Sequence, residues 1–247
     1  MELPARLRPH VVQGLRPHAQ ATPDFPFGLG ETGVHEVCEV SFGDMPALTG
    51  FALAAARPRP GPLAWISQRR LSLNHGTLLA SGLPQLRRSV PPILSVQTSK
   101  PMDALWAVEE AVRSGAIACV IAEVEAIDFT ASRRLTLASQ RHGVPIILLL
   151  PYTCEGATAA SVRWRVAPRP SSANPYDPRA PGHTRWHATL ERSRAAPQLA
   201  GRTFLLDVND ETLSLSMVPG LAPDAPAPRA PRPADEPKHI PALRRRA

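Results

Sequence analysis

Two short, almost entirely apolar segments constrain the fold of this chain more than any other feature. Ile117–Val124 and Val144–Leu150 are continuous apolar runs bounded by turn and polar residues, except for the acid near the end of the first. Such runs are typical of central parallel strands, which are covered on both faces. Between them, Ala131–His142 is expected to be a helix, with Asp128 or Thr130 as its N-cap. The order strand, helix, strand predicts an α/β fold with a parallel sheet.

The preceding segment extends this pattern by one more helix and two more strands. Lys100–Ser114 has apolar residues at helical spacing, and Ser99 is a plausible N-cap. The residues predicted on its buried face are Met102, Leu105, Trp106, Val108 and Val112. Short apolar runs at Leu63–Ser67 and Ile93–Gln97 predict strands, and Leu71–Leu86 between them is expected to be a mixed connection with a turn at Gly82.

After the apolar block, the pattern changes to alternating residues. Val162–Val166, Thr184–Arg194, Thr203–Val208 and Leu213–Met217 predict short antiparallel strands, each with one dry and one wet face. In the first of them, Arg163 and Arg165 would share the wet face, opposite Val162, Trp164 and Val166.

The two ends of the chain differ from its middle in composition. The 29 prolines concentrate at the start, in two internal segments and in the last thirty residues. We therefore expect a Pro/Arg-rich N-terminal segment at 1–24, one folded domain at 25–218, and a disordered basic Pro/Arg-rich tail at 219–247.

The segment Val34–Ala56 has the outline of a nucleotide-binding strand, loop and helix. An alternating strand is expected to start at Val34, followed by a loop at Ser41–Gly50 and a small apolar helix at Phe51–Ala56. A working phosphate-binding loop has the pattern GxxxxGK[ST], in which backbone N–H groups and the Lys hold the phosphates and the hydroxyl holds magnesium.

The residues that would hold a nucleotide are missing from this loop. Gly43 could open it, but Ala47 and Leu48 stand where Gly and Lys are needed, and Thr49 has no neighbouring Lys. Glu123 ends an apolar strand, where an acid could hold magnesium, and Glu36 is another acid on the first strand. Without the Lys, an acid beside a triphosphate would repel it, so we predict a degenerate ATPase core that is not an enzyme.

Two alternatives stay open for these residues. Glu123 could instead pair with Arg133 or Arg134, or cap the helix that follows. The second alternative is a cryptic ATPase that holds phosphate at an unusual site around Gly43–Thr49.

The order of elements resembles the RecA ATPase core, and several segments resemble the ImuA family. These segments are FPFGLGETGVHEV, DMPALTGFALA, LAWIS, MDALWAVEEAVRSGAIACVIAEV, DFTASRRLTLAS and SVRWRVAP, and the resemblance covers Phe25–Met217. It implies a RecA-like core with a mostly parallel central sheet flanked by helices, followed by antiparallel C-terminal strands.

The resemblance also implies a function and its partners. ImuA proteins are RecA-like accessory proteins in SOS-induced mutagenic translesion DNA synthesis and DNA damage tolerance. They act beside ImuB, a polymerase-like hub without catalytic residues, and indirectly beside an error-prone replicative-type DNA polymerase. The alternative is a SulA-like cell-division inhibitor that binds FtsZ, against which the length of 247 residues and the basic extension argue.

The charge of the chain favours contact with a polyanion. Its net charge is +7 and its pI about 10.3, which makes DNA a candidate partner. In RecA, DNA is contacted by loops that correspond to Glu125–Asp128 and Pro151–Ala160, and both are short here. The candidate DNA or partner contacts are Arg133, Arg134, Arg163, Arg165, Arg185, Arg192, Arg194, Arg244, Arg245 and Arg246, with a merely solvated sheet face as the alternative.

The remaining motifs predict no cofactor. Cys38, Cys119 and Cys154 lack metal-site spacing and are expected to be small core residues in a reducing compartment. His183 and His187 have no third ligand nearby and are expected at the surface. The first residues lack an apolar signal-peptide core, so we expect a cytoplasmic protein without membrane contact.

Overall fold

The computed structural model describes residues 29–56, 59–79, 91–209 and 214–218, which form one continuous sheet with helices on both faces. The strands are β1 (Val34–Glu39), β2 (Leu63–Gln68), β3 (Ile93–Thr98), β4 (Cys119–Glu123), β5 (Ile146–Leu150), β6 (Val162–Arg169), β7 (Arg185–Ser193), β8 (Thr203–Asn209) and β9 (Ser214–Met217). The helices are α1 (Met45–Ala55), α2 (Arg69–His75), α4 (Pro101–Arg113), α5 (Phe129–His142) and the 3-10 turn η3 (Pro197–Leu199).

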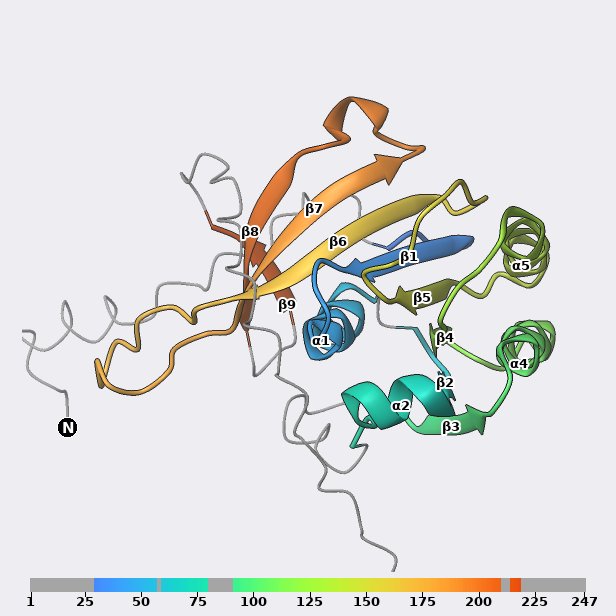
Figure 1. Cartoon of the computed structure of the whole chain (residues 1–247), viewed down its shortest axis with the longest axis horizontal. Helices are drawn as coiled ribbons and strands as arrows, with labels where there is room; N and C mark the ends of the chain where they lie inside the picture. Colours follow the sequence, from blue (N-terminus) through green and yellow to red (C-terminus); the bar gives the residue numbers. More distant parts are fainter. Residues whose placement is uncertain (1–28, 57–58, 80–90, 210–213, 219–247) are drawn as a thin grey trace, which may run out of the picture.

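The sheet has the order β3-β2-β4-β5-β1-β6-β7-β8-β9 (Figure 1). All neighbours from β3 to β6 are parallel, and the pairs from β6 to β9 are antiparallel. This confirms the predicted mixed α/β fold with a mostly parallel sheet and antiparallel C-terminal strands.

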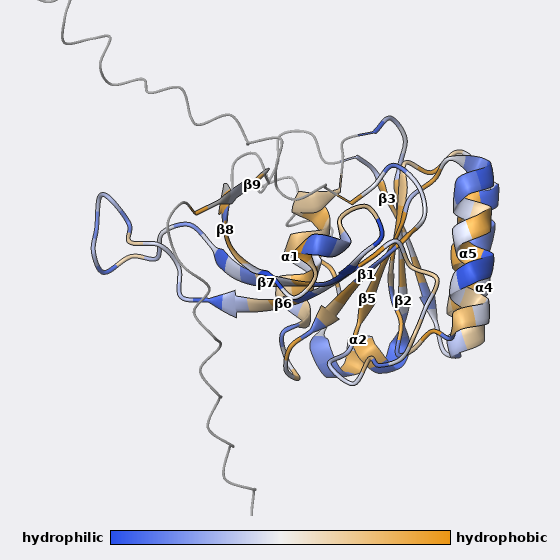
Figure 2. Ribbon diagram, turned by 90° about the horizontal axis from the view of Figure 1, so that it is seen from above, coloured by the Kyte–Doolittle hydropathy of each residue, from blue (hydrophilic) through white to orange (hydrophobic). Residues whose placement is uncertain are grey.

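The two faces of the sheet carry separate apolar layers. Helix α1 covers one face over a core that includes Phe51, Trp65 and Trp164, while α4 and α5 cover the other over Ile66 and Leu148. Figure 1 shows α4 and α5 side by side on one flank and α1 on the other, and Figure 2 shows how hydrophobic the central strands between them are. Burial on both faces explains why β4 and β5 are continuous apolar runs.

The predicted end of α5 at Gly143 and the Asp128 alternative for its N-cap are confirmed, whereas the helix begins at Phe129, two residues before the predicted Ala131. The Asp128 carboxylate accepts a hydrogen bond from the backbone N–H of Ala131 at 2.6 Å, as an N-cap should. Gly143 ends the helix with φ of 70°, a left-handed conformation that glycine adopts without strain.

Three local predictions were wrong. Helix α1 begins at Met45, six residues before Phe51, because Pro46 fits the first turn and the residues that follow are small and apolar. The connection after β2 contains the helix α2, which its mixed composition concealed. On α4, Met102 and Trp106 are exposed instead of buried.

The N-cap of α4 is also a correction, because it is Lys100 without a side-chain hydrogen bond, and Ser99 lies one residue outside. The segments 1–24 and 219–247 and the predicted turn at Gly82 lie outside the described residues. Among the described helices, none is long and apolar enough to cross a membrane.

Candidate functional site

The candidate site lies at the carboxyl ends of the parallel strands, on the α1 face. Strands β2 and β4 are neighbours in the sheet. The chain leaves β2 for β3, which lies on the side of β2 away from β4, and it leaves β4 through α5 for β5, which lies on the side of β4 away from β2. Adjacent strands whose connections diverge in this way leave a crevice at their carboxyl ends, which is where ligands bind in open α/β sheets. The residues predicted to fail as a phosphate site, from Ser41 to Thr49, border this crevice.

The N-terminus of α1 already holds an anion, and that anion is the side chain of Glu39. The carboxylate accepts hydrogen bonds from the backbone N–H of Met45 at 2.8 Å and of Tyr152 at 3.3 Å. His75 Nδ1 lies 3.7 Å from its Oε1. Helix N-termini bind phosphates through such N–H groups. Glu39 therefore occupies the anion-binding position at this helix N-terminus.

The Glu39 carboxylate is buried, and the loop that follows it carries a second acid, Asp44. Glu39 is fully buried, and burial raises its pKa, an effect that His75 and the backbone donors partly offset. The Asp44 side chain accepts the Ser41 backbone N–H at 2.9 Å in the same loop. Gly43 has φ of 97°, but Thr49 and Gly50 belong to α1 and not to a loop.

A cavity of about 180 Å³ lies beside this position. Its lining comprises Met45, Pro46, Thr49, His75, Gly76, Thr77, Leu78, Leu79 and Glu123. Glu123 is 5% exposed, and burial raises its pKa to about 7, with the nearby Trp65 indole N–H acting in the opposite direction. The predicted pairing of Glu123 with Arg133 or Arg134 was wrong, since Arg134 pairs with Glu109 and Asp128 caps α5.

The arginines predicted on an open basic face are instead engaged with acids. Arg163 Nε lies 2.6 Å from the Glu36 carboxylate, and both side chains are buried. Arg192 lies 3.6 Å from the same carboxylate. Arg165 pairs with Glu191, and Arg185 Nε donates to Asp207 at 2.6 Å. Four arginines of this sheet face thus share three carboxylates, and the prediction that they contact DNA or a partner stays a prediction.

Three of these arginines also fix the loop after β5. Arg165 donates to the carbonyl oxygens of Tyr152 and Cys154, at 3.2 and 3.0 Å. Arg163 donates to the carbonyl oxygen of Gly156 at 3.0 Å, and Arg192 donates to that of Thr158 at 3.2 Å. The loop Pro151–Ala160 is therefore held down on the sheet instead of reaching outward for DNA.

The other candidate arginines are distributed elsewhere. Arg133 and Arg194 are exposed, on α5 and after β7 respectively. Arg134 is exposed but pairs with Glu109 at 2.9 Å. Arg244, Arg245 and Arg246 lie outside the described residues.

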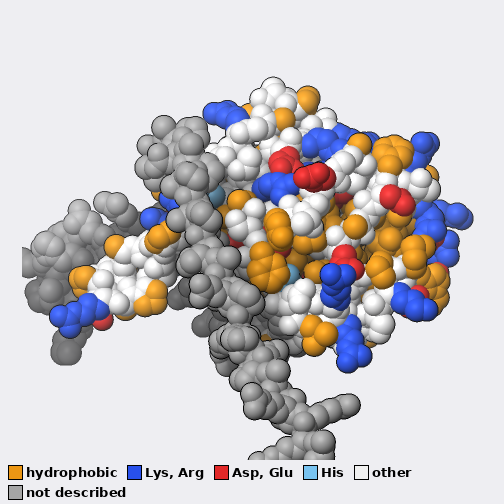
Figure 3. All heavy atoms as spheres, in the orientation of Figure 1, with side chains coloured by type: hydrophobic (Ala, Val, Ile, Leu, Met, Phe, Trp, Pro, Cys, Tyr) orange, Lys and Arg blue, Asp and Glu red, His pale blue; other side chains and the backbone are white. Residues whose placement is uncertain are grey.

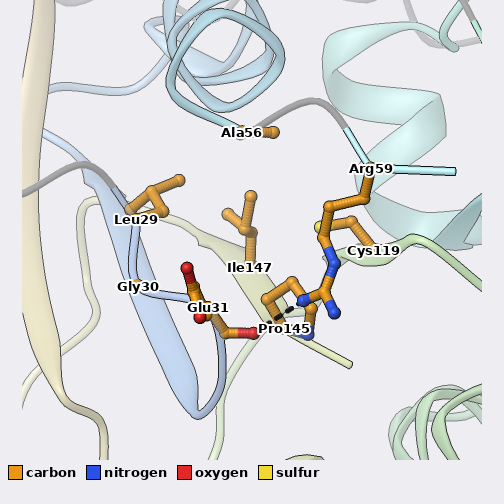
Figure 4. A pocket seen from close by; sticks show the side chains of 8 residues that line it. All are labelled: Leu29, Gly30, Glu31, Ala56, Arg59, Cys119, Pro145 and Ile147. Atoms are coloured by element: carbon orange, nitrogen blue, oxygen red, sulfur yellow. Dashed lines mark hydrogen bonds between the residues drawn. The ribbon is translucent and has the colours of Figure 1, made fainter. Parts of the chain in front are cut away.

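A second cavity, of about 230 Å³, lies at the opposite, amino end of the strands (Figure 4). Its labelled lining is Leu29, Gly30, Glu31, Ala56, Arg59, Cys119, Pro145 and Ile147. Arg59 Nη1 donates to the Glu31 carbonyl oxygen at 2.8 Å, so its guanidinium ties the rim of this cavity to the entry of β1.

All three cysteines are buried free thiols, as expected, and burial raises the pKa of Cys119 to about 12. Cys38 and Cys154, far apart in the sequence, are neighbours, and the contact raises the pKa of Cys38. Among the residues that the structure describes, no group of three or more His, Cys, Asp or Glu side chains could hold a metal ion. His183 is exposed and His187 half-buried.

Sequence reasoning missed Glu39, His75 and the cavity. The available signal for Glu39 was an acid at the last position of the first strand, directly before the degenerate loop. His75 gave no signal, because its position depends on a helix that the sequence did not predict.

Comparison with known proteins now adds to this geometry. No family model matches the chain. The Protein ImuA sequences of two strains of Caulobacter vibrioides are each 32% identical to it over 183 residues, which cover 68% of this chain and 72% of the relative. At this identity and coverage, the resemblance found in the sequence is confirmed: the chain belongs to the ImuA family.

Proposed function

We propose that this chain is a non-catalytic, RecA-like accessory protein of SOS-induced mutagenic translesion DNA synthesis, which acts in the cytoplasm through an ImuB-type, polymerase-like partner. Membership of the ImuA family supports a role in the corresponding mutagenesis system. An error-prone replicative-type polymerase would be reached indirectly through that partner. No observation on the described residues favours the SulA-like alternative.

One observation carries the non-catalytic assignment: the Glu39 carboxylate accepts the N–H of Met45 at the start of α1. A phosphate placed there would have to displace a buried carboxylate that is already hydrogen-bonded, and a second buried acid, Glu123, lines the adjacent cavity. The lysine that would compensate such charge is replaced by Leu48, which is buried. These three features support a core that has lost nucleotide chemistry and kept its fold.

Nucleotide binding by the purified full-length protein tests this assignment directly. Isothermal titration with ATP, with and without magnesium, is expected to show no binding up to millimolar concentration. Binding accompanied by a turnover that Glu123→Gln abolishes would overturn the assignment and restore the cryptic ATPase.

The partner assignment needs its own experiment. Tagged full-length protein should capture the ImuB-type protein of the same cell from a damage-induced culture. Failure of the two purified proteins to associate would contradict the accessory role. Direct DNA contact is a lesser part of the proposal. Among the candidate arginines that the structure describes, only Arg133 and Arg194 are exposed and take no part in the ion pairs given above.

A further inference from the structure

We infer that the cavity beside Glu123 is a receptor for one cationic side chain, an arginine by preference, presented by a partner protein. The inference rests on the proposed accessory function, and it assigns to the vacated nucleotide position a new role as the anchor point of a protein interface.

The size of the cavity suits one side chain. Its volume is about 180 Å³, room for roughly six waters at about 30 Å³ each. Sites for drug-sized ligands span roughly 300–1,000 Å³, so the cavity is small for a whole nucleotide. A single long side chain would fill it.

The charge of the cavity selects a cation. Glu123 lines it at 5% exposure, and no ion pair of Glu123 exists among the described residues. Among the described residues that line the cavity, His75 is the only one with a basic side chain, and its Nδ1 lies 3.7 Å from the Glu39 carboxylate, so any positive charge on His75 is compensated by Glu39. A buried carboxylate without a cation is costly, and a guanidinium that bonds it in bidentate geometry compensates that cost.

The rim of the cavity is apolar, as the surroundings of an anchoring side chain usually are in protein interfaces. Phe42, Leu79 and Tyr152 are exposed large apolar residues of this edge, and the Phe42 ring lies 5.0 Å from that of His75. Figure 3 shows hydrophobic side chains interspersed with both acidic and basic ones on the face seen there. Arginine is preferred to lysine because its planar fork is less strongly hydrated and binds carboxylates in two places.

The test follows the indole N–H resonance of Trp65, which lies next to Glu123. The full-length protein, labelled with ¹⁵N at its four Trp residues, is titrated at pH 8 with N-acetyl-arginine amide, and Trp65→Phe assigns the resonance. The neutral isostere N-acetyl-citrulline amide is the matched ligand control. We expect the Trp65 resonance to shift with the arginine compound and not with citrulline, and Glu123→Gln to weaken binding at least tenfold.

Two further variants make the result specific. Thr49→Leu, which fills the cavity without removing charge, should also abolish the shift, whereas Glu155→Gln, an exposed acid on the loop after β5, should leave it unchanged. Equal shifts with arginine and citrulline, or no shift with either, would overturn the inference. If replacing Arg244, Arg245 and Arg246 by Ser in the full chain moves the Trp65 resonance without ligand, the occupant is the chain's own tail, and the assignment to a partner is wrong.

A second readout separates this inference from the proposed function. If wild-type protein captures the ImuB-type protein, Glu123→Gln should weaken that association at least tenfold, and an unchanged affinity would overturn the role of the cavity in the interface. If wild-type protein captures no such partner, the accessory function fails, while the arginine titration still decides whether the cavity is a cation site.

Discussion

The stability of this protein should depend on pH through Glu123 in a direction unusual for a carboxylate. Burial raises the pKa of Glu123 to about 7 from an ordinary 4.5. Between these two pH values the folded protein holds a proton on Glu123 that the unfolded chain has released. Because the unfolded state then binds fewer protons, stability falls as pH rises through this window.

The magnitude follows from the size of the shift. A difference of 2.5 units between 4.5 and 7 corresponds to about 3 kcal/mol at about 1.4 kcal/mol per unit. Glu123 is 5% exposed, so solvent screening reduces this little. Glu123→Gln keeps the shape and cannot ionise. The difference in unfolding free energy, variant minus wild type, should therefore be about 3 kcal/mol larger at pH 8 than at pH 4.5.

Urea unfolding at five pH values between 4.5 and 8 measures this difference. Other perturbed groups, such as His35 and Glu39, titrate in both proteins and cancel. Glu155→Gln, which removes an exposed acid outside the cavity, is the matched control. A flat profile for Glu123→Gln would refute the reasoning, since it would mean that the ionised carboxylate is already compensated in the folded protein and has no need of a cationic partner.

Three other predictions concern the scaffold. Arg163→Met leaves the buried Glu36 carboxylate with Arg192 at 3.6 Å as its remaining ion-pair partner, so the variant should lose about 3 kcal/mol of unfolding free energy in urea. The double variant Arg163→Met, Glu36→Leu should return to within about 1 kcal/mol of wild type, and equal losses in the single and double variants would contradict the buried pair. Gly50→Ala should destabilise by about 1–3 kcal/mol although alanine favours helices, because its Cβ would lie 2.7 Å from the Trp186 ring; a gain in thermal stability would show that this approach is not close. Burial lowers the pKa of His35 to about 4, so the stability that the neutral imidazole contributes should be lost as pH drops from 6.5 to 4, and the His35→Phe minus wild-type difference in unfolding free energy should rise over this window; a difference that does not vary with pH would place the titrating group elsewhere.

The parallel part of the fold was predictable because its sequence signals are local. Strands β4 and β5 are buried on both faces and therefore apolar throughout, and α5 has its cap at Asp128 and its stop at Gly143. Helix α2 was not predictable, since its residues show no amphipathic period and only packing against β2 selects the helix.

The arginines show why site prediction from pattern was less successful. Alternation correctly placed Arg163 and Arg165 on the face opposite Trp164. It could not reveal that Glu36, 127 residues away, and the carbonyl groups of the loop after β5 lie on that same face. A face of free arginines and a face of ion-paired arginines have the same local sequence, because the acidic partners come from other strands.

The sequence by itself determined the α/β class, the order of the main elements, the missing phosphate-loop lysine and the family. Each of these depends on which residues are present and on their short-range spacing. The tertiary structure alone decided that Glu39 fills the anion position at α1, that Glu123 lines a cavity in which no described residue supplies it with an ion pair, and that the sheet arginines are paired. These features arise between segments that are distant in the chain, and the charge a buried group experiences depends on what the fold brings to it.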